Sequence, residues 1–332
     1  MTTLPLPGPE EIAARAGREV PVLHLPLRET VYAEREMRLR QRAAGHAMGD
    51  YLLLMADLAH AQHELLQAYP EVPLPDADAL RAAVRFGRPA LPAEDWPRDP
   101  RWRDGLHRIL DALHAKLPEG VARSSVARLR ALAPPELERQ ADRLLRGIML
   151  DLDLASAPFI GAALQAYWTH MVLASAAGHG IERLAPFGRI ADATRCPCCG
   201  FLPVASVVRI DASAGGLRYL QCALCATQWH MVRIKCSHCE GTKGIHYQSL
   251  EPRDGDGDPR SGAAVEAETC DTCGSYLKIV RQNRDPQVEA MADDLASLTL
   301  DLLVSEAGFR RHGTSLLLLF GEPDVPDDGG GG

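Results

Sequence analysis

The chain of 332 residues has few aromatic side chains, no long apolar run and no excess of positive charge. Aromatic residues make up 5% of it, so alanine and leucine must fill most of the core, as they do in helical proteins. No apolar run approaches the roughly 18 to 20 residues that a membrane span requires. The net charge of −8 argues against nucleic acid or an acidic membrane as the main partner, because such binding needs surplus lysine and arginine.

The start of the chain is not typical of a secretory signal. Residues 1–11 contain three prolines, and they lack both the basic segment and the apolar segment of a signal peptide. The content of 46% hydrophobic and 24% charged residues is that of a globular protein, and the length favours two or more domains. We therefore expect a soluble, cytoplasmic protein of more than one domain.

Cysteine is absent from the first 195 residues, and all nine cysteines lie between Cys196 and Cys273. This distribution is unlike a disulfide framework and favours a metal-binding or redox region joined to a cysteine-free domain. Eight of the nine form four Cys-x-x-Cys pairs: Cys196/Cys199, Cys222/Cys225, Cys236/Cys239 and Cys270/Cys273. A two-residue spacer lets both sulfurs point into one tight turn, and two turns complete a tetrahedral site for zinc or iron. The sequence thus predicts two metal sites of four cysteines each.

The four pairs can combine into two four-cysteine sites in either of two arrangements. Sequential pairing leaves 22 residues between Cys199 and Cys222 and 30 between Cys239 and Cys270, somewhat more than the usual ribbon spacing of roughly 15–20. It is favoured because connections between successive elements are usually short. In the cross-braced alternative, the first pair meets the third and the second meets the fourth. The ninth thiol, Cys198, is expected to be a spare residue inside the first turn.

The chain before residue 180 has helical spacing of its apolar residues, whereas the cysteine region has strand-like alternation. Helices are predicted at 29–45, 51–69, 76–86, 102–117, 121–132, 135–150 and 158–177. Strands are predicted at 204–210, 217–220, 227–235, 245–250 and 275–280. A turn at 211–216, a polar loop at 251–264 and one amphipathic helix at 288–302 complete the pattern.

The predicted fold class is therefore a multidomain α+β protein. An all-α domain spans residues 1–185, and two small zinc-ribbon modules follow at 186–233 and 234–284. Residues 285–322 carry the C-terminal helix, which is expected to pack back on the helical domain, and 323–332 form a disordered tail. Small β modules bury too little apolar area to fold alone, so bound metal would contribute folding free energy.

Three stretches of the cysteine region resemble the formate dehydrogenase accessory (maturation) protein family, FdhE-like: RCPCCGFLPVASVVR, GLRYLQCALCATQWHMVRIKCSHC and AETCDTCGSYLKI. The resemblance rests on the four pairs in order, on Trp229 and Arg233, and on the Gly-x-Tyr-Leu-Lys stretch after Cys273. It is close over the cysteine region and less diagnostic over the N-terminal helices. It implies two rubredoxin-like modules, iron rather than zinc in at least some members, and a cytoplasmic role in activating formate dehydrogenase by interacting with its catalytic subunit.

The leading hypothesis is thus a maturation factor that binds its partner and is not an enzyme. Rubredoxin-like electron transfer is an alternative, since it requires only bound iron and exposure of the metal site. A nucleic-acid-binding zinc ribbon is disfavoured, because residues 190–280 hold nine lysines and arginines against ten acidic residues. Disulfide exchange is disfavoured too, because strands and turns surround every pair where a thioredoxin-like motif needs a βαβ context.

Overall fold

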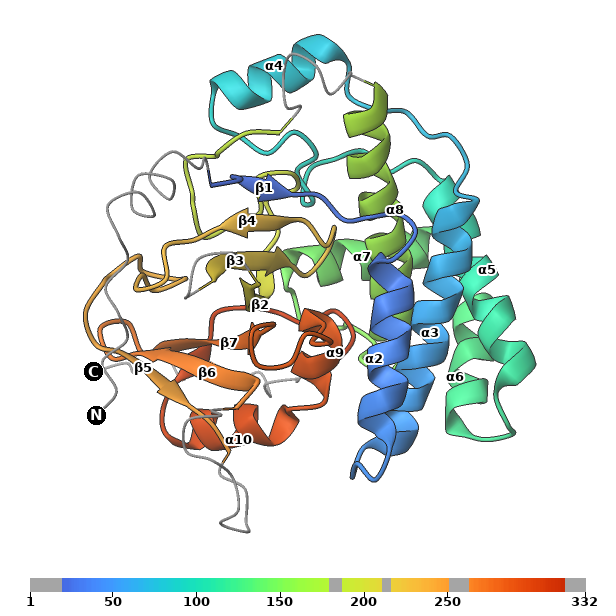
Figure 1. The fold of residues 1–332 in the computed structure, drawn as a ribbon. Coiled ribbons are helices and arrows are strands. Elements are labelled where there is room, and N and C mark those ends of the chain that lie inside the picture. Colours follow the sequence, from blue (N-terminus) through green and yellow to red (C-terminus); the bar gives the residue numbers. More distant parts are fainter. Residues whose placement is uncertain (1–19, 179–186, 211–215, 251–262, 320–332) are drawn as a thin grey trace, which may run out of the picture.

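The computed structural model describes residues 20–178, 187–210, 216–250 and 263–319 (Figure 1). Within these ranges the first part of the chain folds into α2 (Val31–Ala43), α3 (Gly49–Gln67), α4 (Ala77–Arg85), α5 (Arg101–Lys116), α6 (Val121–Arg130), α7 (Pro134–Arg146) and α8 (Ala157–Gly178). Each of these helices coincides with a predicted one to within a few residues, so the helical N-terminal region is confirmed. None of the helices described is both long and apolar enough to cross a bilayer.

Some predictions concern segments that lie wholly or largely outside the described residues. These are the non-secretory start at 1–11, the turn at 211–216, the polar loop at 251–264 and the tail at 323–332.

Helix α8 forms the centre of the helical region. It is buried along most of its length and contacts α3, α5 and α7 (Figure 1). Small residues let other segments approach it closely, and a Cβ atom at Gly161 would lie 2.8 Å from the carbonyl oxygen of Leu316. The C-terminal segment around Leu316 therefore packs directly on α8, which ties the end of the chain to the helical region.

The strands form one mixed sheet. They are β1 (Leu23–His24), β2 (Pro203–Arg209), β3 (Leu217–Cys222), β4 (Gln228–His230), β5 (Ile245–Gln248), β6 (Val265–Cys270), β7 (Ser275–Arg281) and β8 (Arg310–Arg311). The order is β1-β4-β3-β2-β7-β6-β5, and β8 pairs with β7. The short strands β1 and β8, and also β6, were not predicted from the sequence.

The parallel pairing of β2 with β7 joins two antiparallel halves, so the two expected modules are not separate ribbons. Ser206 lies opposite Ile279, and Val207 lies opposite Val280. Both strands are buried along nearly their whole length, and strands covered on both faces belong in the middle of a sheet rather than at its edge.

The prediction of a single helix at 288–302 is wrong, because two short helices occupy this segment: α9 (Ala290–Leu295) and α10 (Leu298–Glu306). The Lys278 ammonium donates to the carbonyl oxygen of Asp294 at 2.7 Å, and the Ser297 hydroxyl donates to that of Asp293 at 2.6 Å. A continuous helix would use these carbonyls for its own ladder, so the side chains end it. Helix α9 contacts α2 in the helical region, whereas α10 packs on β6 and β8.

Candidate metal centres

The eight paired cysteines gather into two groups, and each group combines two successive pairs. The first centre consists of Cys196, Cys199, Cys222 and Cys225, and the second centre of Cys236, Cys239, Cys270 and Cys273. Within each centre all four sulfurs lie within 4.8 Å of one another. The structure therefore has the sequential arrangement and not the cross-braced one.

The sulfur separations fit a tetrahedral metal ion. Sγ–Sγ distances are 3.4–3.6 Å for three contacts of the first centre and 3.8 Å for two contacts of the second. Metal–sulfur bonds of about 2.3 Å place the sulfurs of a tetrahedron about 3.8 Å apart, whereas a disulfide brings two sulfurs to about 2.05 Å. None of the nine cysteines forms a disulfide, and each centre can hold one metal ion.

A shared backbone conformation aims both sulfurs of a pair at one point. The residue after the second cysteine of each pair is left-handed, with φ of 71° at Gly200, 57° at Ala226, 59° at Glu240 and 64° at Gly274. In three of the four pairs the backbone N–H of the first cysteine donates to the carbonyl oxygen of the residue five positions later in the chain. These donors are Cys196, Cys222 and Cys236, and the distances are 2.8–3.0 Å. The two glycines were a sequence signal for this turn, because glycine adopts that conformation without a steric penalty.

Hydrogen bonds to the sulfurs favour their ionised form. Cys222 Sγ accepts from the backbone N–H groups of Leu224 and Cys225 at 3.3 and 3.4 Å, and Cys236 Sγ accepts from that of His238 at 3.4 Å. At these two thiols burial outweighs the hydrogen bonds and raises the pKa above its ordinary value. Burial acts to raise the pKa of Cys196, but hydrogen bonds with neighbouring thiols outweigh it and lower that pKa to about 6. Metal binding would displace the protons that remain, so metal affinity should rise with pH.

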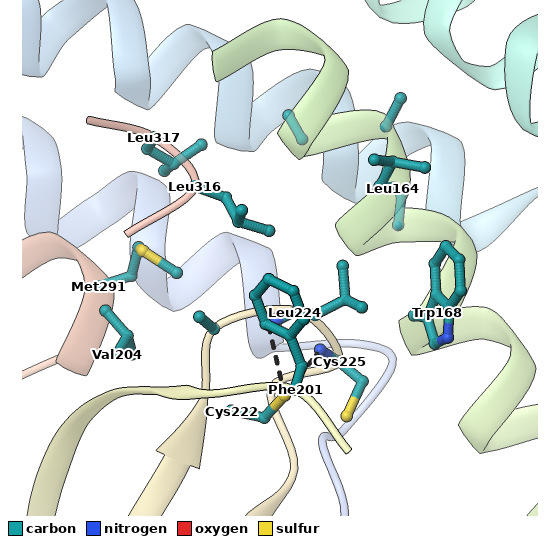
Figure 2. Close-up of a cluster of buried hydrophobic side chains, with 14 of the residues drawn as sticks. Leu164, Trp168, Phe201, Val204, Cys222, Leu224, Cys225, Met291, Leu316 and Leu317 are labelled. Carbon is teal, nitrogen blue, oxygen red and sulfur yellow. Dashed lines mark hydrogen bonds between the residues drawn. The ribbon is translucent and has the colours of Figure 1, made fainter. Parts of the chain in front are cut away.

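The first centre is buried between the sheet and the helical region. The side chain of Gln165 on α8 donates to the carbonyl of Ala223 at 2.7 Å. The N–H of Leu91, in the segment between α4 and α5, donates to the carbonyl of Cys198 at 2.9 Å. Figure 2 shows Cys222 beside a cluster of buried apolar side chains that includes Trp168 of α8. The helical region thus supplies one wall of this centre.

The second centre lies at the protein surface. Cys236 and Cys270 are buried, whereas Cys273 is half-buried and Cys239 is exposed. Burial acts to raise the pKa of Cys270, but backbone N–H groups that face its sulfur lower that pKa to about 7. A pocket of about 690 Å³ adjoins Cys239. Solvent can therefore reach this centre from one side.

The remaining candidates of the cysteine region stay outside both centres. Among the described residues no histidine belongs to either four-sulfur group. His238 Nδ1 is hydrogen-bonded to the Ser275 hydroxyl at 3.0 Å, and His246 lies 3.0 Å from Asp271. Cys198 is fully buried beside the first centre, where it contacts the hydroxyl of Thr227 at 3.6 Å. Burial raises its pKa well above the ordinary value, which disfavours reaction at this thiol.

Known proteins resemble this chain along almost its whole length. Three family models match: "FdhE, N-terminal" at residues 20–179, "FdhE, central domain" at 195–233 and "FdhE, C-terminal domain" at 234–318. The Protein FdhE homolog of Klebsiella pneumoniae is 38% identical over 93% of this chain and 94% of its own length. Protein FdhE of Salmonella paratyphi A is 40% identical over the same shares.

A solved structure agrees with these relatives. The crystal structure of the FdhE protein from Pseudomonas aeruginosa has a TM-score of 0.75 and 39% identity, covering 91% of this chain and 100% of that chain. The match extends over the helices as well as the cysteine region, and this shared identity and fold carry the assignment. The chain belongs to the FdhE family of formate dehydrogenase accessory proteins.

Proposed function

We propose that this protein is a cytoplasmic accessory factor that brings formate dehydrogenase to its active state by binding the catalytic subunit. The observation that carries the proposal is the match to all three FdhE models. A binding role without catalysis suits the two centres, because four cysteines fill a tetrahedral site and leave no open position for a substrate.

Each centre is proposed to hold one metal ion, bound by Cys196, Cys199, Cys222 and Cys225 in the first and by Cys236, Cys239, Cys270 and Cys273 in the second. Iron is favoured by the family resemblance, and zinc is the alternative, because tetrahedral thiolate suits both. Bound iron would supply one-electron chemistry, whereas bound zinc would supply only structural stability.

Co-purification tests the proposed partner. Tagged protein should retain the formate dehydrogenase catalytic subunit from cells that make both, and deletion of the gene should abolish formate dehydrogenase activity. Activity should return with the wild-type gene and with Arg108→Glu, a control that changes an exposed side chain on α5. The proposal is lost if the subunit does not co-purify and the deletion strain keeps its activity.

The exposed second centre favours electron transfer as a second candidate function. Cys239 is exposed and Cys273 is half-buried, so a redox partner can approach the metal closely. Iron-loaded protein should then show a reversible colour change on reduction and reoxidation. A colourless, zinc-loaded protein that fully restores formate dehydrogenase activity in the deletion strain would exclude this function.

A further inference from the structure

The two centres have the same ligands but very different surroundings. Each sulfur-bearing residue of the first centre is at most 1% exposed. In the second centre Cys236 and Cys270 are buried, but Cys239 is exposed and Cys273 is half-buried. An incoming molecule can therefore touch a ligand of the second centre, whereas it can touch none of the first in the folded state.

Reaching the first centre requires parting the sheet from the helical region. The turns that carry its cysteines are tied to that region by three hydrogen bonds: Leu91 N–H to Cys198, Ala93 N–H to Cys199 and Gln165 to Ala223, at 2.7–2.9 Å. The apolar cluster of Figure 2 covers the same side. These contacts break only on substantial unfolding, so a metal ion in the first centre should be retained.

The second centre opens to a polar pocket instead. The pocket of about 690 Å³ is lined by Cys239, by the basic residues Arg195, Arg310 and Arg311, and by the acidic residues Asp192 and Glu240, among others. Both carboxylates have cationic partners, because Asp192 faces Arg195 and Glu240 pairs with Lys235. Arg195 is partly paired with Asp192 at 3.6 Å, whereas the side chain of Arg310 is exposed on the short strand β8. An anionic ligand that enters the pocket therefore meets an arginine side chain on the way to the exposed cysteine.

We propose that the second centre is an exchange site, where metal enters and leaves on the side of Cys239, and that the first centre releases its metal only when the protein unfolds locally. This inference rests on the metal content proposed above. In the exchange step the bond between the metal and Cys239 Sγ breaks, and a donor atom of an incoming anionic ligand bonds to the metal. The released thiolate takes a proton from water, and no electron is transferred. The ligand class is a small anionic chelator or a thiolate.

The exchange site is tested by metal release from the full-length protein loaded with cobalt(II), whose thiolate absorption bands report each bound ion. EDTA is the probe. Two phases of equal amplitude are expected, with release from the first centre at least about tenfold slower because it requires local unfolding. Cys239→Ser should abolish or accelerate the fast phase and leave the slow phase unchanged, with an unchanged circular dichroism spectrum.

A second variant tests the pocket as the route of entry. Arg310→Glu should slow the fast phase about two- to fivefold with EDTA and leave it unchanged with the neutral chelator 1,10-phenanthroline. Arg108→Glu on α5 makes the same charge change at a distant exposed site and should leave both rates unchanged.

A single phase that releases both ions, or a slow phase that changes together with the fast phase in Cys239→Ser, would overturn the inference alone. Wild-type protein that binds no metal would contradict the proposed metal content as well, so the two failures are distinguishable.

Discussion

A buried ion pair between Arg218 and Glu268 joins the two halves of the sheet. Arg218 lies on β3 and Glu268 on β6; the side chains are 0% and 2% exposed, and Nη2 lies 2.7 Å from Oε1. The same guanidinium donates to the hydroxyl of Ser206 on β2 and, at 2.7 Å, to the carbonyl of Lys235. Lys235 directly precedes Cys236, so the pair also holds the segment that leads into the second centre.

Arg218→Met keeps most of the side-chain volume but leaves the Glu268 carboxylate buried without its partner. Removing one member of a buried pair costs about 3–5 kcal/mol, a large part of the roughly 5–15 kcal/mol by which domains are stable. Adding Glu268→Gln removes the second charge and should recover about half of that loss, since the hydrogen bonds to Ser206 and Lys235 stay absent.

The destabilisation caused by Arg218→Met should also depend on pH. Burial raises the pKa of Glu268 above its ordinary value, while Arg218 opposes that rise. Without Arg218 the folded-state pKa rises further. A carboxyl whose pKa is raised on folding stabilises the fold below its unfolded pKa, and this stability is lost as pH rises through the folded pKa. Arg218→Met should therefore be less destabilising at about pH 5.5 than at about pH 7.5.

Urea unfolding followed by far-ultraviolet circular dichroism measures these differences in the metal-loaded protein. The control is Arg108→Met on α5, an exposed position that should change the free energy of unfolding by less than about 0.5 kcal/mol. The reasoning is refuted if Arg218→Met stays within about 1 kcal/mol of the wild type, or if the double variant is as unstable as the single one.

Four further substitutions test the contacts that hold the fold and the centres together, and urea unfolding measures the effect of each. Lys278→Met should cost about 3–5 kcal/mol, because its fully buried ammonium pairs with two aspartates, whereas the half-exposed Lys116→Met should cost under about 1. Glu240→Gly should stabilise the protein and Gly274→Ala destabilise it, each by about 1 kcal/mol, since both residues are left-handed; shifts of the same sign would contradict this account. Gln165→Leu should cost about 1–3 kcal/mol, because the buried carbonyl of Ala223 loses its donor and the side-chain amide of Gln62 loses an acceptor; an unchanged free energy of unfolding would contradict this prediction.

Local features of the fold could be predicted because their causes are local in sequence. Helix α7 begins at Pro134, one residue before its predicted start, and Pro134 acts on its own backbone. The helix ends before Gly147, whose φ is 68°, a local signal that the predicted end at residue 150 left out of account. The two-residue spacer of each Cys-x-x-Cys pair likewise sets a turn whatever surrounds it. The sequence by itself therefore determined the helical region and the eight cysteines of the two centres.

Non-local features were decided by the tertiary structure. The Lys278 ammonium breaks the helix that apolar spacing alone predicts across Ala296, and it comes from a neighbouring strand. The pairing of Ser206 with Ile279 merges two expected modules into one sheet across a long separation in sequence. The unequal exposure of the two centres follows from packing, because only the first is covered by α8 and the segment before α5. Spacing specifies which sulfurs can meet, but burial depends on what the rest of the chain places beside them.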